Sequence, residues 1–532
     1  MEDQEVPGPK YGSLDPRAWN LDPYDTHSNA TLRLMEAFFS QYLSMTNRIF
    51  PRSALERWVR QCRTKTEDEL MLLHSLLALG SAFVRNADDF GSICAERAGH
   101  AVAAKFGKFS LPLMQSRLLL ATFHHAQGRE ALTWEYGGAM LRALNSENLN
   151  TEEGCAAPSA QSSRSFLDLN DEQLRECKRR TFWAAFVWDV SYIVISIFLY
   201  NASPWRSPMT TSLTIYQRLG AFCTNTFKYF PVRAVHLRLP SPDQDYEEGM
   251  RSKAPLFEWP AALTTNTSLD DGSVFEAFWF SILELLSEAV ELVLSNVHQS
   301  RSTCTHQYEM VVSEVQARLS KWRNDLPTEI ENSIADPCNA TENRRIGTAS
   351  TMLAMYHLSN LHLLRFTRHS LLSKDQIRQR VIAARAQAGS ILQIARILCS
   401  FAQTLGEGQN LHQMLSAGLG YAVFVAIDTV TAGGYATELE AILVSAMDGL
   451  NILQVVGYTW HSCKLQSKLV EKRIEDIQAL AQQSHDQSSV NHEGGDKGWR
   501  MGMPLEVSFE ADYDVMFGLE SATFFEILRE DR

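Results

Sequence analysis

The sequence predicts an all-α fold, a multi-helix array of antiparallel helices joined by short connections. Apolar residues recur at helical intervals along most of the chain, and β-branched runs with strict alternation are almost absent. Such a chain buries its apolar stripes by packing helix against helix. Long helices are predicted over most of 271–298, 303–325, 344–371, 374–405, 410–432 and 437–482.

The N-terminal half carries clear signals for helix ends. Thr66 and Glu69 have the spacing of a capping box, in which each side chain bonds the backbone N–H of the other residue. Two further helices are expected in "SLPLMQSRLLLATFHHAQG" and "REALTWEYGGAMLRALNSENLN". Gly128 separates them, so they are predicted to form a helical hairpin.

Composition limits the classes of partner. The 532 residues are 45% hydrophobic and 21% charged, which suffices for a large core, and the net charge is −13. This acidic balance lacks the basic face that neutralises nucleic-acid phosphates. The short basic stretches "CRTKT", "CKRR" and "ENRRIG" are interpreted as solvated helix faces.

The distribution of cysteines and the N-terminal segment indicate the cellular compartment of the protein. The nine cysteines are scattered without a CxxC pair, so a disulfide scaffold is not expected, and Cys62 and Cys94 are predicted to be structural thiols. The segment "MEDQEVPGPKYGSLDP" has no apolar core, so no signal peptide is expected. We therefore expect reduced thiols in a cytosolic or nuclear protein.

Motifs for catalysis are missing from the sequence. It contains no GxSxG, HExxH, P-loop or GxGxxG pattern, so we expect no enzyme, no catalytic residue and no bound cofactor or metal. His124 and His125 are adjacent and would point apart on a helix, whereas a ligand pair needs a spacing of four residues. Both histidines are predicted to lie on a polar helix surface.

Shifts in composition divide the chain. Residues 1–27 read as a disordered lead-in, 28–482 as the helical region, 483–502 as a polar linker and 503–532 as an acidic-aromatic tail. Acidic residues keep such a tail solvated while its aromatic residues stay available, which is typical of an activation segment that folds on a partner. The alternative is a terminal helix docked on the core. The candidate contact residues are Phe509, Tyr513, Phe517, Phe524 and Phe525.

One apolar stretch has the length of a membrane span. From Phe182 to Tyr200 the only formal charge is Asp189. A membrane anchor at 182–200 is therefore an alternative, but Asp189 near its middle costs about 2.5–3.5 kcal/mol on insertion scales. No second span is predicted, so we expect no membrane association.

Several short motifs follow one another between about residues 30 and 480. The first pair, a Gln-x-x-Leu-Leu-Leu helix and a Trp-x-Tyr-x-Gly helix, flanks Gly128. An Arg-Arg-x-Phe-Trp motif, a Leu-Pro pair and "LSKWRNDLP" come later. This order resembles the regulatory, or middle-homology, domain of fungus-specific transcription factors. The matching positions are Gln115, Trp134, Tyr136, Gly138, Arg179, Arg180, Phe182, Trp183, Asp189, Leu239, Pro240, Tyr246, Gly249 and Trp322.

The resemblance implies a function in transcription. It implies a nuclear regulator of fungal type that acts on the transcription machinery or with another regulator, with a homodimer as one arrangement. Such regulators often control secondary-metabolite gene clusters. The alternative is a protein-interaction or ligand-sensing helical module that does not bind DNA.

The sequence departs from this family in its DNA-binding part. The family usually carries a six-cysteine zinc cluster near its N-terminus, and no cysteine precedes Cys62 here. We therefore expect DNA binding only through a module missing from this chain or supplied by a partner.

A second departure lies at Asp189. The family has Asp-Arg here, but Val190 follows Asp189, and removal of 190–217 would restore the pair with Arg218. The codons of "VSY", "LT" and "YQ" permit a splice donor, a branch point and an acceptor. We interpret 190–217 as a translated, unspliced intron; the alternative is a real surface insertion.

Overall fold

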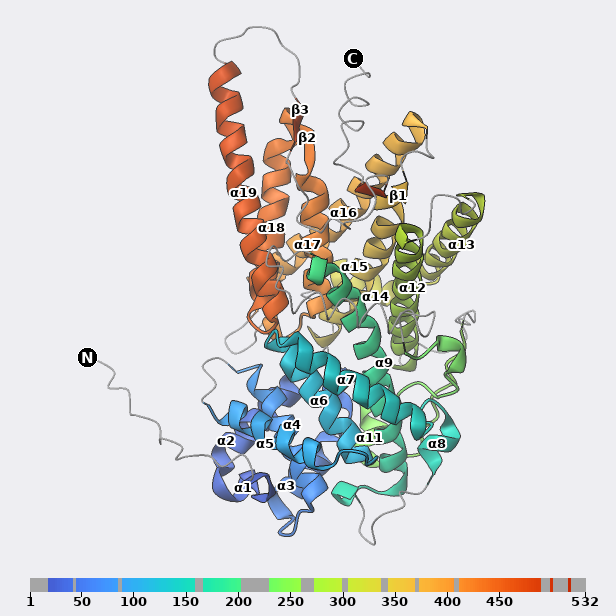
Figure 1. The fold of residues 1–532 in the computed structure, drawn as a ribbon, viewed down its shortest axis with the longest axis vertical. Coiled ribbons are helices and arrows are strands. Elements are labelled where there is room, and N and C mark those ends of the chain that lie inside the picture. The colour runs from blue at the N-terminus through green and yellow to red at the C-terminus, as the bar shows by residue number, and fades with distance from the viewer. Residues whose placement is uncertain are drawn as a thin grey trace, which may run out of the picture.

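Helices build almost the whole molecule, which confirms the predicted all-α fold. The lower part of Figure 1 holds α1–α8 and the upper part holds α12–α19, and α9 lies between them. The structure, a computed structural model, describes residues 18–41, 45–84, 89–157, 166–201, 229–259, 272–298, 305–335, 343–368, 373–405, 411–488, 498–500 and 515–517.

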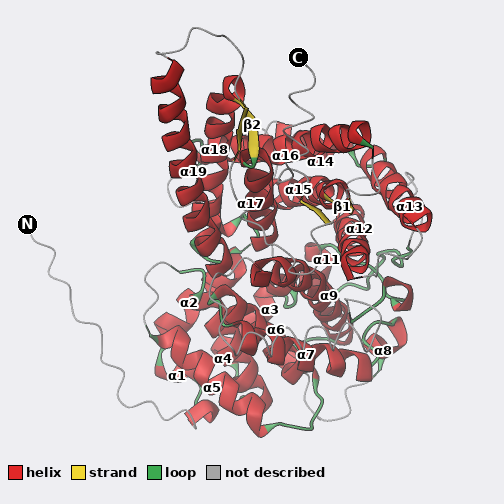
Figure 2. Ribbon diagram, turned by 45° about the horizontal axis from the view of Figure 1, so that its top comes forward, coloured by secondary structure: helices red, strands yellow, loops and turns green. Residues whose placement is uncertain are grey.

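The lower group of helices surrounds α6 (Leu111–Ala126), whose residues from Leu113 to Ala126 are all buried. It packs against α4 and α7 (Figure 2). The other α-helices of this group are α1 (Pro23–Thr26), α2 (Ser28–Ser40), α3 (Arg52–Gln61), α4 (Glu67–Ser81), α5 (Phe90–Ala104), α7 (Glu130–Ser146), α8 (Glu152–Ala156), α9 (Asp171–Asn201) and α11 (Asp243–Glu248). Four short 3-10 helices join them: η1 (Ala18–Asn20), η2 (Met45–Arg48), η3 (Phe166–Asp168) and η4 (Val232–Ala234).

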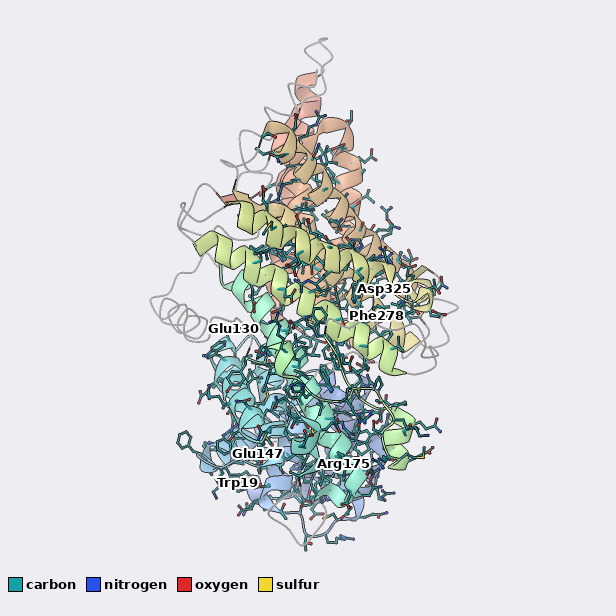
Figure 3. All side chains as sticks on the ribbon, turned by 90° about the vertical axis from the view of Figure 1, so that its right-hand side faces the viewer. Trp19, Glu130, Glu147, Arg175, Phe278 and Asp325 are labelled. Atoms are coloured by element: carbon teal, nitrogen blue, oxygen red, sulfur yellow. The ribbon has the colours of Figure 1, made fainter. Side chains whose placement is uncertain are left out.

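The upper group surrounds α17 (Ala417–Thr431), in which every residue but Gly418 is buried. It packs against α15, α16, α18 and α19. The remaining helices are α12 (Gly272–His298), α13 (Thr305–Asn324), α14 (Thr328–Ala335), α15 (Asn343–Arg365), α16 (Lys374–Ala402), α18 (Leu439–Gly457), α19 (His461–Ser488), η6 (Leu411–Gln413) and η7 (Ala436–Glu438). Figure 3 shows side chains packed throughout both groups, with Arg175 in the lower one and Phe278 in the upper one.

Two small antiparallel strand pairs accompany the helices. One joins β1 (Phe366–Arg368) to β4 (Val515–Phe517), with Phe366 opposite Phe517. The other joins β2 (Gly433–Tyr435) to β3 (Gly498–Arg500), with Gly434 opposite Trp499. Both β1 and β2 directly follow long helices, so these pairs lie at helix ends and do not alter the fold class.

The predicted local signals are confirmed. Thr66 caps α4 in a full capping box with Glu69, with N–O distances of 2.8 Å and 3.3 Å. Gly128 lies between α6 and α7 with φ +70°, the left-handed conformation that favours glycine, and these helices form the predicted hairpin.

The C-terminal half shows one wrong boundary. The predicted helix over 437–482 is two helices, α18 and α19, separated by a turn from Tyr458 to Trp460. At the end of α18 a Cβ on Gly457 would lie 2.9 Å from the backbone nitrogen of Lys464. The absence of a side chain at Gly457 therefore allows the chain to reverse within three residues.

Two predicted segment boundaries also differ from those in the structure. The lead-in predicted over 1–27 contains η1 and α1 from Ala18 onward, and residues 1–17 lie outside the described residues. The linker predicted over 483–502 begins inside α19, which continues to Ser488. Of the tail, Phe517 lies in β4, and Phe509, Tyr513, Phe524 and Phe525 lie outside the described residues.

The stretch at 182–200 lies within α9. Its first part is core, because Phe182, Trp183 and Phe186 are at most 1% exposed. The helix continues past Val190, itself 1% exposed, to Asn201, so the predicted insertion begins without a break in α9. Residues 202–217 lie outside the described residues.

Other helices have the length and hydropathy of a membrane span. Among the described residues these are Asp375–Ala402 and Leu439–Gly457, with mean hydropathies of 1.2 and 1.5. Both pack against α17. The core helix of a globular protein has the same length and composition, so this finding is weak evidence for a membrane.

Candidate functional site

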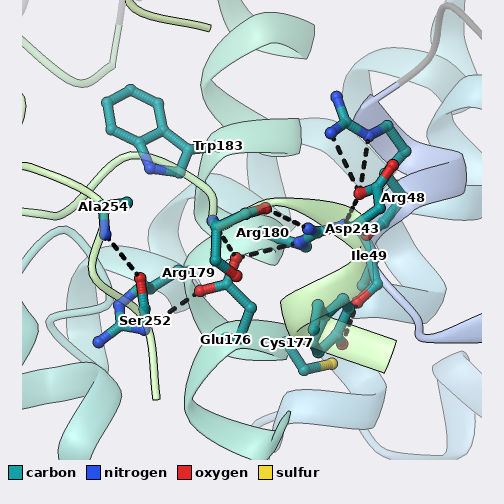
Figure 4. Close-up of polar contacts among 12 residues, drawn as sticks. Arg48, Ile49, Glu176, Cys177, Arg179, Arg180, Trp183, Asp243, Ser252 and Ala254 are labelled. Carbon is teal, nitrogen blue, oxygen red and sulfur yellow. Dashed lines mark hydrogen bonds and ion pairs between the residues drawn. The ribbon is translucent and has the colours of Figure 1, made fainter. Parts of the chain in front are cut away.

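The Arg-Arg-x-Phe-Trp motif on α9 lies at the centre of an ion-pair network in which Arg179, Arg180 and Glu176 are buried and Asp243 is exposed (Figure 4). Arg180 is 2% exposed, and its guanidinium donates to Glu176 at 3.0 Å and to Asp243 at 2.7 Å. It also donates to the backbone carbonyls of Arg48, at 2.9 Å, and Ser241, at 2.7 Å. Its cation lies over the ring of Tyr246. One arginine therefore joins α9, η2 and α11.

Arg48 extends the network toward the upper helices. Its guanidinium pairs with Asp243 at 3.1 Å and with Glu276 of α12. Burial alone would raise the pKa of Asp243, but Arg48 and Arg180 hold it well below its usual value. Asp243 is thus a fixed anion that bonds both arginines.

Arg179 makes a second, bidentate contact. It donates to both oxygens of Glu152 in α8, at 2.9 Å and 2.7 Å, and pairs with Glu176 at 3.1 Å. Burial acts to raise the pKa of Glu152, yet hydrogen bonds from Arg179 and from the backbone of Arg238 lower it. The carboxylates of Asp243 and Glu152 are therefore held ionised, which suits structural anchors rather than acids or bases.

The aromatic part of the motif packs between the two groups of helices. Trp183 stacks on Phe280 of α12 with ring centroids 4.1 Å apart, and its indole N–H donates to the carbonyl of Arg238 at 2.8 Å. The ring of Phe182 packs edge-on against that of Phe230, with the ring centroids 5.1 Å apart. Asp189 is 4% exposed and accepts from the backbone N–H of Tyr229 at 2.8 Å. Asp189, inside α9, is thus bonded to Tyr229, the first residue that the structure describes after this helix.

The other motif residues lie in separate places. Leu239 is 3% exposed and Pro240 is buried, both next to the Arg180 contacts. Trp322 of α13 is 5% exposed and donates to the carbonyl of Phe278 at 3.1 Å. Trp134, Tyr136 and Gly138 lie on α7 and are half-buried. The motifs therefore support the packing of several helices and do not converge on one cleft.

Two predictions about basic stretches were wrong. The "CKRR" stretch is not a solvated face, since Lys178, Arg179 and Arg180 are at most 7% exposed. In "CRTKT", the side chain of Lys65 is 2% exposed and pairs with Asp22 at 2.5 Å. The partner acids lie far away in the sequence, so the local pattern gave no sign of burial.

The histidine prediction was wrong as well. His124 and His125 are buried, at 5% and 7% exposure. Burial, with the charge of Arg129 adding to it for His124, lowers the pKa of each to about 4. Both are therefore neutral at pH 7. His124 stacks on Tyr136 with centroids 5.5 Å apart.

Sequence reasoning missed the residues that complete these contacts. Gly137, not Gly138, is the packing glycine of α7: a Cβ there would lie 1.9 Å from the ring of Trp188 in α9. The ion pairs also involve Arg48, Glu176 and Glu276. Apart from their charge, nothing in the sequence around these residues indicates that they form buried ion pairs. The spacing of Glu176 and Arg180, four residues apart on one helix, was the one usable clue.

The site has no metal-ligand geometry. Within the described part of the chain no group of three His, Cys, Asp or Glu side chains is placed to hold a metal ion. Cys155 and Cys177 lie beside the arginines, and burial raises the pKa of these thiols to about 12 and about 11. They are therefore protonated at pH 7 and unsuited to act as nucleophiles there.

Comparisons with known proteins agree with this description. No curated protein and no solved structure matches the chain significantly. Residues 36–196 match the sequence model of a family described as the fungal specific transcription factor domain. The matched range runs from α2 into α9 and contains Arg179, Arg180 and Trp183. This family is a transcription-factor domain and not an enzyme family. Residues 36–196 of this chain are therefore similar to a fungal specific transcription factor domain.

Proposed function

We propose that the chain is a non-enzymatic transcription regulator of fungal type, in which the helical domain is the regulatory part. The match over 36–196 is the observation that carries this proposal. The buried network supports it, because Arg48 and Trp183 connect the matched helices to Glu276 and Phe280 of α12. A change in the lower helices can reach the upper helices through these contacts.

A reporter assay tests the regulatory role. The full chain is fused to a heterologous DNA-binding domain in a fungal host, and reporter transcription is measured. We expect activation, and we expect Phe524→Ala with Phe525→Ala to reduce it several-fold if the tail 503–532 is the activation segment. Ser521→Ala with Thr523→Ala is the matched control. A nuclear fusion protein without any effect on transcription would contradict the proposal.

DNA binding and location need separate measurements. We propose that the chain contacts promoters through a partner or a further module, so the purified chain should not shift promoter DNA in a gel. Specific binding by this chain alone would contradict that part. A fluorescent fusion should concentrate in the nucleus. Transcript profiling of a deletion strain would show whether its targets form a secondary-metabolite cluster.

Residues 190–217 remain a proposed retained intron. The continuity of α9 to Asn201 and the family match to residue 196 are also compatible with translated protein. Genomic DNA and transcript reads decide between the two. Reads that join the codon of Asp189 directly to that of Arg218 would establish the intron, and codons without donor and acceptor signals would reject it.

A further inference from the structure

Two short strands tie the C-terminal segment of the chain to the helical domain. Beyond α19 the structure describes only β3 and β4, and each pairs with a strand of the helical domain, β3 with β2 and β4 with β1. β1 begins directly after the last residue of α15, and β2 begins two residues after the end of α17. The described part of this segment is therefore held by backbone pairing.

The local sequences suit this pairing. β1 is Phe-Thr-Arg and β4 is Val-Met-Phe, and β-branched and aromatic residues favour extended backbone. β2 begins with Gly433 and Gly434, which have no side chain, so the backbone of β3 can approach closely.

Both strands of the helical domain belong to the same packed group of helices. α15 and α17 pack against each other, β1 also contacts α12, and β2 contacts α17. Figure 1 shows β1 and β2 among the upper helices. The positions of β1 and β2 are thus set by helices of the core, whereas β3 and β4 reach them from the C-terminal end of the chain.

A pair of three-residue strands is a weak contact. An isolated two-stranded pair is marginal in water, and each hydrogen bond adds little net stability. The pairing is helped by the tether, because a segment of the same chain has a high effective concentration. It is also open to competition, since an extended peptide from another protein can add to the same strand edge. Such a contact can be released without unfolding of the helices.

We propose that β1 and β2 form a docking surface for the C-terminal segment of this chain, and that the pairing of β4 with β1 restrains the tail 503–532. β4 lies in the middle of that acidic-aromatic tail. While its residues are paired as a strand, they are not free to fold on a partner, so a partner must first displace them from β1. The consequence for transcription rests on the proposed function, but the docking does not.

Disulfide trapping in the purified full chain tests the docking. Thr367 lies opposite Met516, and Arg368 lies opposite Val515. Neighbouring pairs of an antiparallel ladder alternate between wide and close spacing, so one of these two pairs is the close one that a disulfide can bridge. Thr367→Cys with Met516→Cys, or Arg368→Cys with Val515→Cys, should cross-link within one chain under mild oxidation. The yield should be severalfold above that of the control pair, Thr367→Cys with Ser508→Cys.

The native cysteines set the background of this experiment. Cys62 and Cys399 are partly exposed. The single variant Thr367→Cys is therefore oxidised in parallel, and the cross-linked peptides are identified by mass spectrometry. Equal yields in the test and control pairs, or cross-links that join two chains instead of one, would overturn the docking.

The reporter assay tests the restraint on the tail. Val515→Pro with Met516→Pro weakens the strand pair, because N–H groups alternate in direction along a strand and one of two neighbours faces β1. Thr367→Pro with Arg368→Pro weakens the same pair from the other side and leaves the tail sequence unchanged. Both variants should raise reporter transcription severalfold.

A matched variant and a folding measurement complete the assay. Val507→Pro with Ser508→Pro makes the same change in the tail outside the described strands and should leave transcription unchanged. The Tm of each purified variant checks that the helices remain folded. Unaltered transcription in both strand variants, at an unaltered Tm, would overturn the restraint. If no version of the chain affects the reporter, the proposed regulatory function fails, and the disulfide yields still decide whether the tail is docked.

Discussion

The central helices of the two groups, α6 and α17, are both largely buried. They differ in whether the buried charged side chain that each carries has a partner of opposite charge. Asp428 of α17 is 0% exposed and pairs with Arg365 of α15 at 2.6 Å, with Arg473 of α19 at 3.8 Å. Arg117 of α6 is similarly enclosed without such an acid. The paired charge of Asp428 fixes the packing of three helices, whereas Arg117 forms no ion pair among the described residues and joins no second helix in this way.

The largest effect is expected at Asp428. Asp428→Asn removes the anion between two buried arginines, and breaking a buried pair in this way costs about 3–5 kcal/mol. Denaturant unfolding of the purified chain measures the loss. Asp448→Asn is the matched control, because Asp448 pairs with the exposed Arg396 at 3.0 Å and should cost less than about 1 kcal/mol. Equal losses would mean that the burial of Asp428 does not matter.

Substitution of Gly137 should disturb the contact between α7 and α9, whereas substitution of its neighbour Gly138 should not. Gly137→Ala places a methyl group against the Trp188 ring, and overpacking of this kind costs about 1–3 kcal/mol. Gly138→Ala has room and should be neutral or stabilising by up to about 1 kcal/mol, since alanine favours helix. Urea unfolding of both variants tests the difference, and a loss in Gly138→Ala would show that the assignment is reversed.

Acid should weaken the lower helices more than the upper ones. Burial lowers the pKa of His125 to about 4 and that of His74 to about 3, below the ordinary value of 6.5, and His362 is the corresponding residue in α15. The unfolded chain gains protons below pH 6.5 while the folded chain does not. Stability is therefore complete above about pH 7 and falls as the pH drops toward 4, by up to about 1.4 kcal/mol per pH unit for each histidine.

Tm measured from pH 8 to 4.5 tests this dependence. His125→Gln should flatten the slope, whereas His100→Gln, at an exposed position on α5, should not change it. A Tm independent of pH between 6.5 and 4.5 would contradict the buried, neutral state of these histidines.

The smallest effect is expected at Arg117, and it sharpens the comparison. Arg117→Met should change stability by less than about 1 kcal/mol in the absence of anions, or increase it, because it removes a charge without a partner. Arg180→Met should lose several kcal/mol, because it removes one of the two arginine partners of Glu176 and of Asp243 and leaves the carbonyls of Arg48 and Ser241 without their donor. Chemical unfolding in chloride buffer compares the two variants. If they lose the same stability, Arg117 has a structural role like that of Arg180.

Local sequence was a good guide to helices and a poor guide to buried charge. The Thr66 capping box and the Gly128 hairpin were predictable, since their partners lie within a few residues. The split at Gly457 was not, because apolar periodicity continues through the turn. The Phe182–Tyr200 stretch reads as a membrane span by length, but its described side chains, which run to Val190, pack inside the protein.

The sequence by itself determined the all-α class, most helix positions and the order of family motifs, because these depend on periodicity and on residues close in the chain. Only the tertiary structure decided which charges are buried and paired. Arg179 meets Glu152, 27 residues away, and Arg180 meets Asp243, 63 residues away. The apolar pattern of a helix is the same for an exposed arginine and for a buried arginine that pairs with a carboxylate on another helix. Whether such a carboxylate lies nearby depends on long-range packing.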